Sequence, residues 1–254
     1  MKRVQIDCKL SKLYARSKFI LILIALATLW PSALAQEETA DSWFKKGQEL
    51  GRNGSYEEAV KAYDNALELE PKNAEAWLGK GTVLSLWAGS THDEGLYEEA
   101  INAFDKAIEL DPQQTRGRLG KASTLLNLGR YNESLKTLDE AIEAASQDTE
   151  KAQIWFEKAH LFAEQGNYNE TAKALEKASL LDPKDKDLWI NGGVLLSAVL
   201  SRNDEALKYY ERALQIDSAD SYAWYAKGEA LKALGRTAEA DAAFTKAEEQ
   251  GYQR

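Results

Sequence analysis

The chain has two histidines, His92 and His160. His92 lies in a short segment, residues 91–94, whose side chains could bind a metal ion. Four consecutive residues there carry a side-chain atom that can ligate a metal ion: Thr91, His92, Asp93 and Glu94. A metal site needs ligands spaced so that several side chains reach one ion, and one histidine beside adjacent acids does not provide that spacing. The segment is better explained by added helical turns and a solvated loop, or by a protruding recognition loop, than by a metal site.

No other residues form a pattern typical of catalysis. His160, the second histidine, has no serine or aspartate at a spacing that suggests a nucleophilic triad. The one cysteine is Cys8, so residues 36–254 hold no cysteine nucleophile, thiolate metal site or disulfide. We therefore assign no catalytic residue, expect no metal and no cofactor, and predict that the protein is not an enzyme.

The elements that must position any binding residues are short helices that repeat. Between Asp41 and Pro71 the sequence predicts two amphipathic helices around a turn at Gly54, because apolar and small residues recur at spacings of three and four. The end of this unit, AYDNALELEP at 62–71, returns as AFDKAIELDP at 103–112, ALEKASLLDP at 174–183 and YYERALQIDS at 209–218. One such hairpin cannot bury its apolar face alone, so the copies must stack.

These residues resemble the tetratricopeptide repeat (TPR), a helix-turn-helix unit of about 34 residues. Six copies fit residues 40–254, beginning near Ala40, Ala74, Thr115, Ala152, Lys186 and Ser221. Numbering each repeat from 1, position 8 is always small (Gly47, Gly81, Ala122, Ala159, Gly193, Gly228) and position 27 is always alanine (Ala66, Ala107, Ala141, Ala178, Ala213, Ala247). The resemblance implies an all-α fold, a right-handed superhelical solenoid, with helices at 41–53, 56–69, 74–88, 97–110, 115–128, 131–144, 150–165, 168–181, 186–200, 203–216, 221–234 and 237–250.

Three insertions break the period. Repeat two carries seven extra residues between its helices, around 88–95; repeat three carries three before the next helix, and repeat five carries one near Asn203. Insertions in solenoids usually form loops on an edge, often the binding edge. Two other departures concern packing. Arg118 replaces the family's tryptophan at position 4, so we expect repeat three to be the weakest, and position 7 is lysine in five repeats, whose stems can cover apolar surface (Lys46, Lys80, Lys121, Lys158, Lys227).

Residues 1–35 have the pattern of a secretory signal. Six basic residues against one acid precede the apolar run FILILIALATLW at 19–30, and Ala33-x-Ala35 follows. We predict cleavage before Gln36, a short linker at 36–39 and a secreted or extracytoplasmic protein. Because the basic segment is long, an uncleaved membrane anchor at 19–30 is the alternative.

The charge of the remaining chain excludes some partner classes. Six of the 32 basic residues but one of the 41 acidic residues precede Gln36, which leaves 26 against 40, a net charge of −14. Nucleic acids and anionic lipids both need clustered Lys and Arg, so neither is an expected partner. Contact with a membrane is expected through the N-terminal segment alone, if that segment is uncleaved.

The resemblance implies that the concave face, lined by the first helix of each repeat, binds an extended peptide or a helix of another protein. The candidate groove residues are Phe44, Gln48, Leu78, Thr82, Leu119, Ser123, Phe156, His160, Ile190, Tyr225 and Glu229. Position 5 is apolar in every repeat, which favours either a hydrophobic partner or simple family packing. The carboxylate clamp of chaperone-binding TPR domains does not map here, because its first positions fall on Phe44, Gln48 and Gly79.

Three segments match the N-x-[ST] acceptor pattern for glycosylation, at Asn53, Asn132 and Asn169. All three lie at or beside the turn between the two helices of a repeat, where a sugar could be accommodated.

We predict an exported interaction scaffold or adaptor that binds a segment of another protein in its groove. A first alternative is a self-assembling structural or assembly factor at the outer face of the membrane. Its copies would associate through the last repeat, whose apolar face is open unless Tyr252 folds back over it. A second alternative is a metal-dependent enzyme whose chemistry lies in the 85–96 segment.

Overall fold

The computed structural model describes residues 39–253, and within that range the chain forms twelve α-helices and no strand. The helices are α2 (Ala40–Arg52), α3 (Tyr56–Leu69), α4 (Ala74–Thr91), α5 (Glu94–Leu110), α6 (Thr115–Asn127), α7 (Tyr131–Ala144), α8 (Asp148–Glu164), α9 (Tyr168–Leu181), α10 (Lys186–Val194), α11 (Asn203–Ile216), α12 (Ser221–Ala233) and α13 (Thr237–Glu249). A π-helix, η1 (Leu195–Val199), continues α10. The predicted signal or anchor at 1–35 and the linker up to residue 38 lie outside the described residues.

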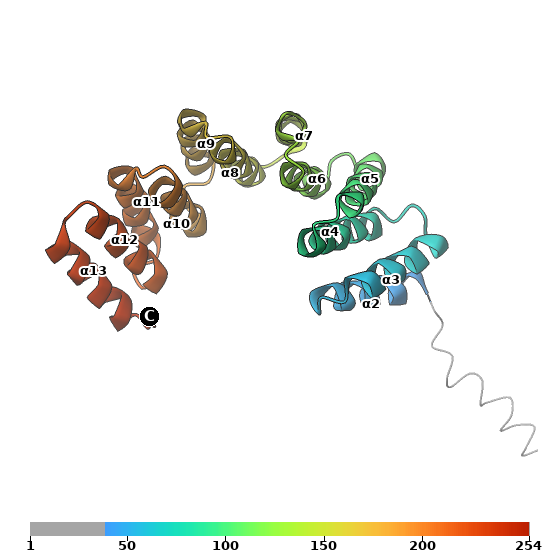
Figure 1. Ribbon diagram of the computed structural model, residues 1–254, viewed down its shortest axis with the longest axis horizontal. Coiled ribbons are helices and arrows are strands. Elements are labelled where there is room, and N and C mark those ends of the chain that lie inside the picture. The colour runs from blue at the N-terminus through green and yellow to red at the C-terminus, as the bar shows by residue number, and fades with distance from the viewer. Residues whose placement is uncertain (1–38, 254) are drawn as a thin grey trace, which may run out of the picture.

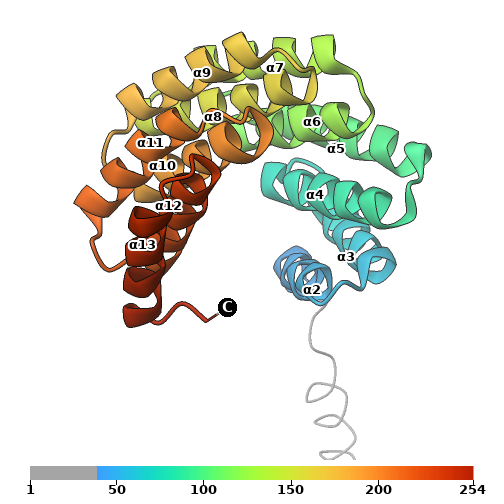
Figure 2. The ribbon, with the colours of Figure 1, turned by 60° about the vertical axis from the view of Figure 1, so that its left-hand side comes forward.

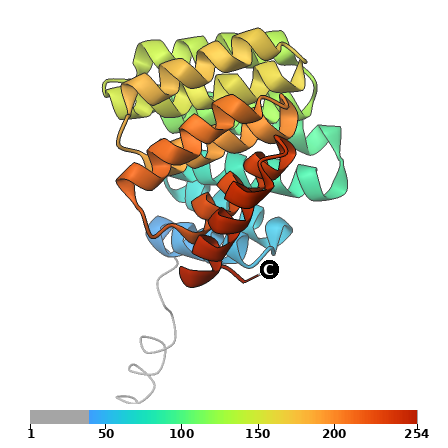
Figure 3. The same ribbon diagram turned by 90° about the vertical axis from the view of Figure 1, so that its left-hand side faces the viewer.

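The helices pair into six antiparallel hairpins that stack into an open arc, with α2/α3 at one end and α12/α13 at the other (Figure 1). The first helix of each hairpin lies on the inner side of the arc and the second on the outer side (Figures 1 and 2). Successive hairpins are also stepped along the axis, which gives the superhelix seen from the side (Figure 3). The prediction of an all-α, right-handed superhelical solenoid is confirmed. Among residues 39–253, no helix combines the length and apolar character needed to cross a bilayer.

Where position 8 is glycine, an aromatic ring of the same repeat lies directly on it. A Cβ atom added to Gly81 would come 2.9 Å from Phe104, and one added to Gly193 would come 2.6 Å from Tyr210. The position-27 alanines are also buried; Ala66 is 1% exposed and Ala141 is fully buried. Close approach of the paired helices therefore fixes the repeat at these positions.

A glycine at position 15 ends the first helix in four repeats, with φ between 68° and 76° at Gly54, Gly129, Gly166 and Gly235. The next residue then donates its N–H to a carbonyl five residues back, as Arg130 does to Leu125 at 2.9 Å. This left-handed cap turns the chain into the second helix.

The seven-residue insertion does not form the expected loop at 88–95. It extends α4 to Thr91 and starts α5 at Glu94, so the predicted ends of these helices at 88 and 97 are wrong. Two residues suffice for the connection because each caps a helix. His92 adopts the left-handed conformation and donates its N–H to Ala88 at 2.7 Å, and Asp93 accepts from the N–H of Gly95 at 2.8 Å. The interpretation as added helical turns is the one that the structure bears out.

The other insertions are also absorbed by helices. The three extra residues before repeat four start α8 at Asp148, one turn ahead of Ala152, where the repeat begins. The single extra residue lies in η1, ahead of the expected place near Asn203, and widens the last turn of the first helix. In this repeat the capping hydrogen bond spans six residues, from the N–H of Arg202 to Leu196 at 2.8 Å. Ser201, with φ of 54°, takes the position that glycine occupies elsewhere.

Candidate binding groove

A hollow of about 290 Å³ lies on the inner side of the first two repeats. It brings together four of the predicted groove residues, Phe44, Gln48, Leu78 and Thr82. The other residues that line it come from α2, α3, α4 and the start of α6: Gly51, Arg52, Tyr63, Glu75, Gly79, Val83, Leu86 and Arg116. The sequence therefore located this hollow, but not its full lining.

Its floor is the ring of Tyr63, which is 3% exposed. The ring packs edge-on against Phe44, with centroids 6.0 Å apart, and a Cβ atom on Gly79 would come 2.7 Å from it. Burial raises the pKa of Tyr63, an effect that the positive charge of Arg52 opposes, so the phenol remains a hydrogen-bond donor at neutral pH.

A second hollow, of about 480 Å³, lies where α8 and α10 begin. Its lining contains five carboxylates and no lysine or arginine: Glu150, Glu157, Asp182, Asp185 and Asp187, with Thr149, Ala152, Gln153, Phe156, Leu188 and Asn191. Thr149 and Glu150 belong to the extra turn of α8, so the three-residue insertion builds part of this wall. The predicted groove residue here is Phe156, and three of the five acids belong to the run DPKDKD at 182–187.

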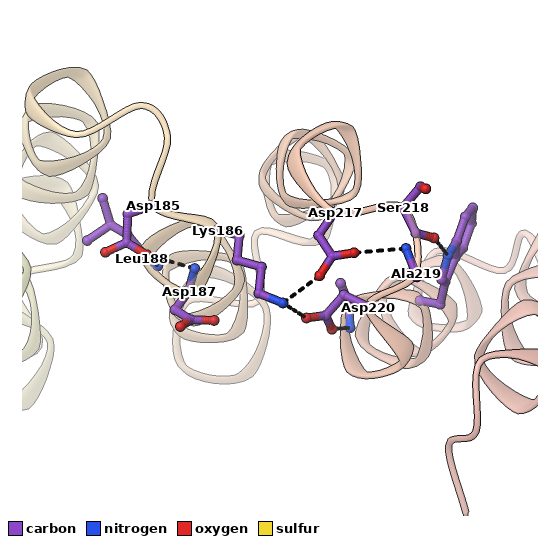
Figure 4. Close-up of polar contacts among 10 residues, drawn as sticks. Asp185, Lys186, Asp187, Leu188, Asp217, Ser218, Ala219 and Asp220 are labelled. Atoms are coloured by element: carbon purple, nitrogen blue, oxygen red, sulfur yellow. Dashed lines mark hydrogen bonds and ion pairs between the residues drawn. The ribbon is translucent and has the colours of Figure 1, made fainter.

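Lys186, which lies next to this second hollow, pairs with two aspartates outside it. Lys186 places its ammonium 2.7 Å from Asp217 and 2.8 Å from Asp220, on the loop before α12 (Figure 4). These hydrogen bonds raise the pKa of Lys186, and Lys186 in turn lowers the pKa of Asp217. Asp185 caps α10 by accepting from the N–H of Asp187 at 2.9 Å. Glu157 lies mid-helix, and burial raises the pKa of its carboxyl.

The remaining predicted residues lie along the same inner helices. Ser123, His160 and Glu229 are exposed, and the ring of His160 lies 4.8 Å from that of Phe156. Leu119 is half-buried against α7, whereas Ile190 is 5% exposed and Leu78 4%. The position-5 residues thus do not form a continuous exposed strip, and for Leu78 and Ile190 the packing interpretation applies.

Tyr252 folds back onto the inner side of the last repeat and stacks on Tyr225, with ring centroids 4.3 Å apart. The outward side of α13 keeps a hollow of about 350 Å³, lined by Lys232, Thr237, Ala240, Asp241, Phe244, Thr245 and Glu248. Self-association through this repeat stays a prediction.

The three glycosylation acceptors Asn53, Asn132 and Asn169 are all exposed. The hydroxyl residues of two of these motifs, Ser134 and Thr171, are fully buried, and each donates to a backbone carbonyl. Use of these acceptors stays a prediction.

Neighbouring repeats are joined by an ion pair that the sequence did not reveal. The position-7 lysine reaches the position-25 acid of the preceding repeat, as in Lys80–Asp64, Lys121–Asp105, Lys158–Asp139 and Lys227–Glu211, at 2.5 to 3.0 Å. Position 4 forms a second link. Trp77 donates to the carbonyl of Pro71 at 3.0 Å, and Arg118 donates to that of Pro112 at 2.7 Å. Arg118 thus keeps the tryptophan's hydrogen bond, and these links hold the curvature of the groove.

Among residues 39–253, no group of three or more His, Cys, Asp and Glu side chains is arranged to hold a metal ion. The histidine and aspartate first considered for such a site, His92 and Asp93, cap α4 and α5.

Comparison with known families assigns the class of the chain. Four family models described as tetratricopeptide repeat or TPR repeat match residues 47–85, 92–154, 156–221 and 209–242. The chain belongs to the TPR proteins.

Solved structures share the fold at low identity. A tetratricopeptide repeat protein from Parabacteroides merdae is 19% identical, with a TM-score of 0.60 over 90% of this chain and 85% of that one. Pseudomonas aeruginosa pilF is 17% identical, with a TM-score of 0.59 over 84% of this chain and 91% of that one. MamA from Desulfovibrio magneticus is 21% identical, with a TM-score of 0.53 over 72% and 97%.

Two curated relatives are longer than the region they share with this chain. The human protein O-mannosyl-transferase TMTC1 is 24% identical over 209 residues, which are 76% of this chain and 23% of that protein. A Methanocaldococcus jannaschii protein described as uncharacterized is 36% identical over 47 residues, which are 18% of this chain and 55% of that protein.

Proposed function

We propose that the protein is an exported interaction scaffold that binds a segment of another protein on the inner face of the solenoid. The observation that carries this proposal is the hollow over α2 and α4, where Phe44, a predicted groove residue, and Leu86 line an open apolar surface. Leu86 is 52% exposed, so this hollow presents apolar surface to solvent beside Phe44.

The arrangement of the repeats supports the same site. The ion pairs between position-7 lysines and preceding acids link neighbouring hairpins at four of the five junctions, which supports one continuous, curved inner surface. A preorganised surface binds a flexible segment with less loss of entropy than a mobile one. No catalytic role is part of the proposal.

Site-specific photo-crosslinking tests where the partner binds. The photoreactive residue p-benzoylphenylalanine replaces Ser123, which is exposed on the inner helix α6, or Lys136, whose side chain is 80% exposed on the outer helix α7. In cells that make the protein, we expect a covalent adduct of higher mass from position 123 and none from position 136. Adducts from the outer position alone would contradict the proposal.

Export rests on the N-terminal pattern, namely the basic segment, the apolar run at 19–30 and Ala33-x-Ala35. N-terminal sequencing of the natural protein should begin at Gln36. An intact Met1 on membrane-bound protein would replace cleavage by anchoring.

A further inference from the structure

The hollow over α2 and α4 combines an apolar surface with donor groups that have no partner within residues 39–253. Tyr63 is 3% exposed and lines the hollow, yet its hydroxyl makes no hydrogen bond with any described residue. The amide of Gln48 and the guanidinium of Arg52 are equally unpaired in that part of the chain. Arg52 is exposed and Gln48 is half-buried, so an incoming acceptor can reach both side chains from solvent. A hydrogen bond from a guanidinium to a carboxylate is stronger than one between neutral groups, so this set of donors favours an anionic acceptor.

The charge of the rim specifies which acceptor. Arg52 comes from the last turn of α2, and its positive charge is felt at Tyr63. Arg116 comes from the first turn of α6, where its guanidinium lies 3.4 Å from Glu75. Glu75 also accepts a hydrogen bond from Gln114 at 2.5 Å, so the long contact leaves the guanidinium of Arg116 able to bind a further carboxylate at shorter distance.

The two arginines stand on either side of α4, which carries the apolar residues Leu78 and Leu86. A ligand that matches them must present an apolar side chain between two anionic groups. A chain terminus offers one carboxylate, whereas Asp and Glu side chains can flank the apolar residue on both sides.

We propose that this hollow docks an internal segment of the partner protein in which large apolar side chains are flanked on both sides by Asp or Glu. The inference rests on the proposed function and assigns the chemistry of its partner. Arg52, Gln48 and the Tyr63 hydroxyl bind one carboxylate, Arg116 binds the other, and the apolar side chain packs on Phe44 and Leu86.

The second hollow supports the placement of that segment. Its five carboxylates repel an acidic ligand, and Lys186, which could have attracted one, is held by Asp217 and Asp220 (Figure 4). An acidic segment is therefore directed to the first two repeats and away from α8 and α10.

Fluorescence anisotropy with defined peptides tests the inference on the full chain. The probe is Gly-Ser-Asp-Glu-Leu-Phe-Glu-Asp-Ser-Gly, labelled with fluorescein and blocked at both ends so that it has no terminal carboxylate. We expect binding that weakens with added salt, and at least about tenfold weaker binding when Lys replaces every acid or Ala replaces Leu-Phe.

Variants of the protein locate the site. Arg52→Glu and Leu86→Ser should each weaken binding by about tenfold, and Arg52→Gln, which removes the charge without reversing it, by less. The matched outer-face controls are Lys136→Glu and Leu180→Ser, since Leu180 is 74% exposed; they should bind as the natural chain does. Unchanged melting temperatures confirm that the variants are folded.

The inference is overturned if the acidic peptide does not bind, if the lysine peptide binds equally well, or if Arg52→Glu and Leu86→Ser bind as the controls do. Binding that requires an unblocked terminal carboxylate would also overturn it. If crosslinks from position 123 persist after such a result, the proposed function stands and the assigned chemistry is wrong.

Discussion

Lys158 and Asp139 form an ion pair across two repeats, with Nζ of Lys158 2.6 Å from Oδ1 of Asp139. The lysine side chain is 8% exposed and lies over the ring of Trp155, whereas the aspartate side chain is 60% exposed. The aspartate therefore neutralises a charge that is buried in the junction between α7 and α8. The same pair recurs at three other junctions, which makes it a structural feature of this solenoid.

We predict that Asp139→Ala destabilises the protein by about 1–3 kcal/mol, because it leaves the buried ammonium of Lys158 without its carboxylate. Urea denaturation followed by circular dichroism measures the change. Asp41→Ala is the control, because it breaks an ion pair with Lys45 in which the lysine side chain is 70% exposed and the aspartate side chain 69%. This change should cost less than about 0.5 kcal/mol. Equal shifts for the two variants would refute the structural role of the pair.

The period of small and apolar residues predicted the hairpins, because a position such as Gly81 is dictated by a contact within one repeat, with Phe104. The ion pairs were not predicted. Lys121 and Asp105 are 16 residues apart and belong to different repeats, and nothing local distinguishes a lysine that pairs from one whose stem covers apolar surface.

For the candidate site, too, the sequence predicted positions within one repeat but not the contacts between repeats. Phe44, Gln48, Leu78 and Thr82 follow from the repeat register, whereas the meeting of Arg52 and Arg116 in one hollow, and of five acids in the other, depends on how separate repeats pack. The insertions illustrate this limit of the sequence. Their lengths could be counted, but whether Thr91 and Asp148 belong to loops or to helices depends on helix caps and packing.

The junction between repeats four and five lacks the lysine, and a tyrosine fills its place. Position 7 is Gly192, and a Cβ atom there would come 2.8 Å from the ring of Tyr209, which also packs on Trp189 at 5.0 Å. Gly192→Lys alone should cost about 1–3 kcal/mol through overpacking, and Tyr209→Ala about 2–4 kcal/mol through the lost ring.

In the double variant the new lysine has room and can pair with Glu176, the position-25 acid of repeat four. We therefore predict that the two losses of stability are not additive. The double variant should lose at least about 1 kcal/mol less than the sum of the two single losses. A double-mutant cycle by urea denaturation checks this. Additive losses would mean that the tyrosine does not replace the lysine.

Ser201 occupies the left-handed position that is glycine in four other repeats, with φ of 54°. A side chain there crowds the backbone, so Ser201→Gly should stabilise the protein by about 0.5–1 kcal/mol. The reverse change at an equivalent cap, Gly235→Ser, where φ is 74°, should destabilise it by a similar amount. Thermal unfolding of both variants measures the pair of shifts, and shifts of the same sign would contradict the assignment of Ser201 to the cap.

The last prediction concerns Glu157, whose pKa burial raises above the ordinary value of 4.5, with an electrostatic interaction from His160 acting against the shift. The groups around it are His160 on its own helix and the other carboxylates of the hollow, Glu150, Asp182, Asp185 and Asp187. A raised carboxyl pKa means that ionisation costs more in the folded chain than in the unfolded chain. The cost is absent while both states are protonated and develops as the pH rises through the folded-state pKa.

Glu157→Gln removes this cost, so the variant should be more stable than the natural chain at about pH 7, and the difference should fade on acidification to about pH 4. Glu57→Gln is the control of opposite sign, because a hydrogen bond from Lys61 lowers the pKa of Glu57. That variant should lose stability toward neutral pH, by a small amount since the pair is exposed. The urea midpoints of the two variants and the natural chain, measured between about pH 4 and about pH 8 at fixed ionic strength, test both expectations. A difference for Glu157→Gln that is independent of pH, or negative at neutral pH, would show that burial does not disfavour the charge of this carboxylate.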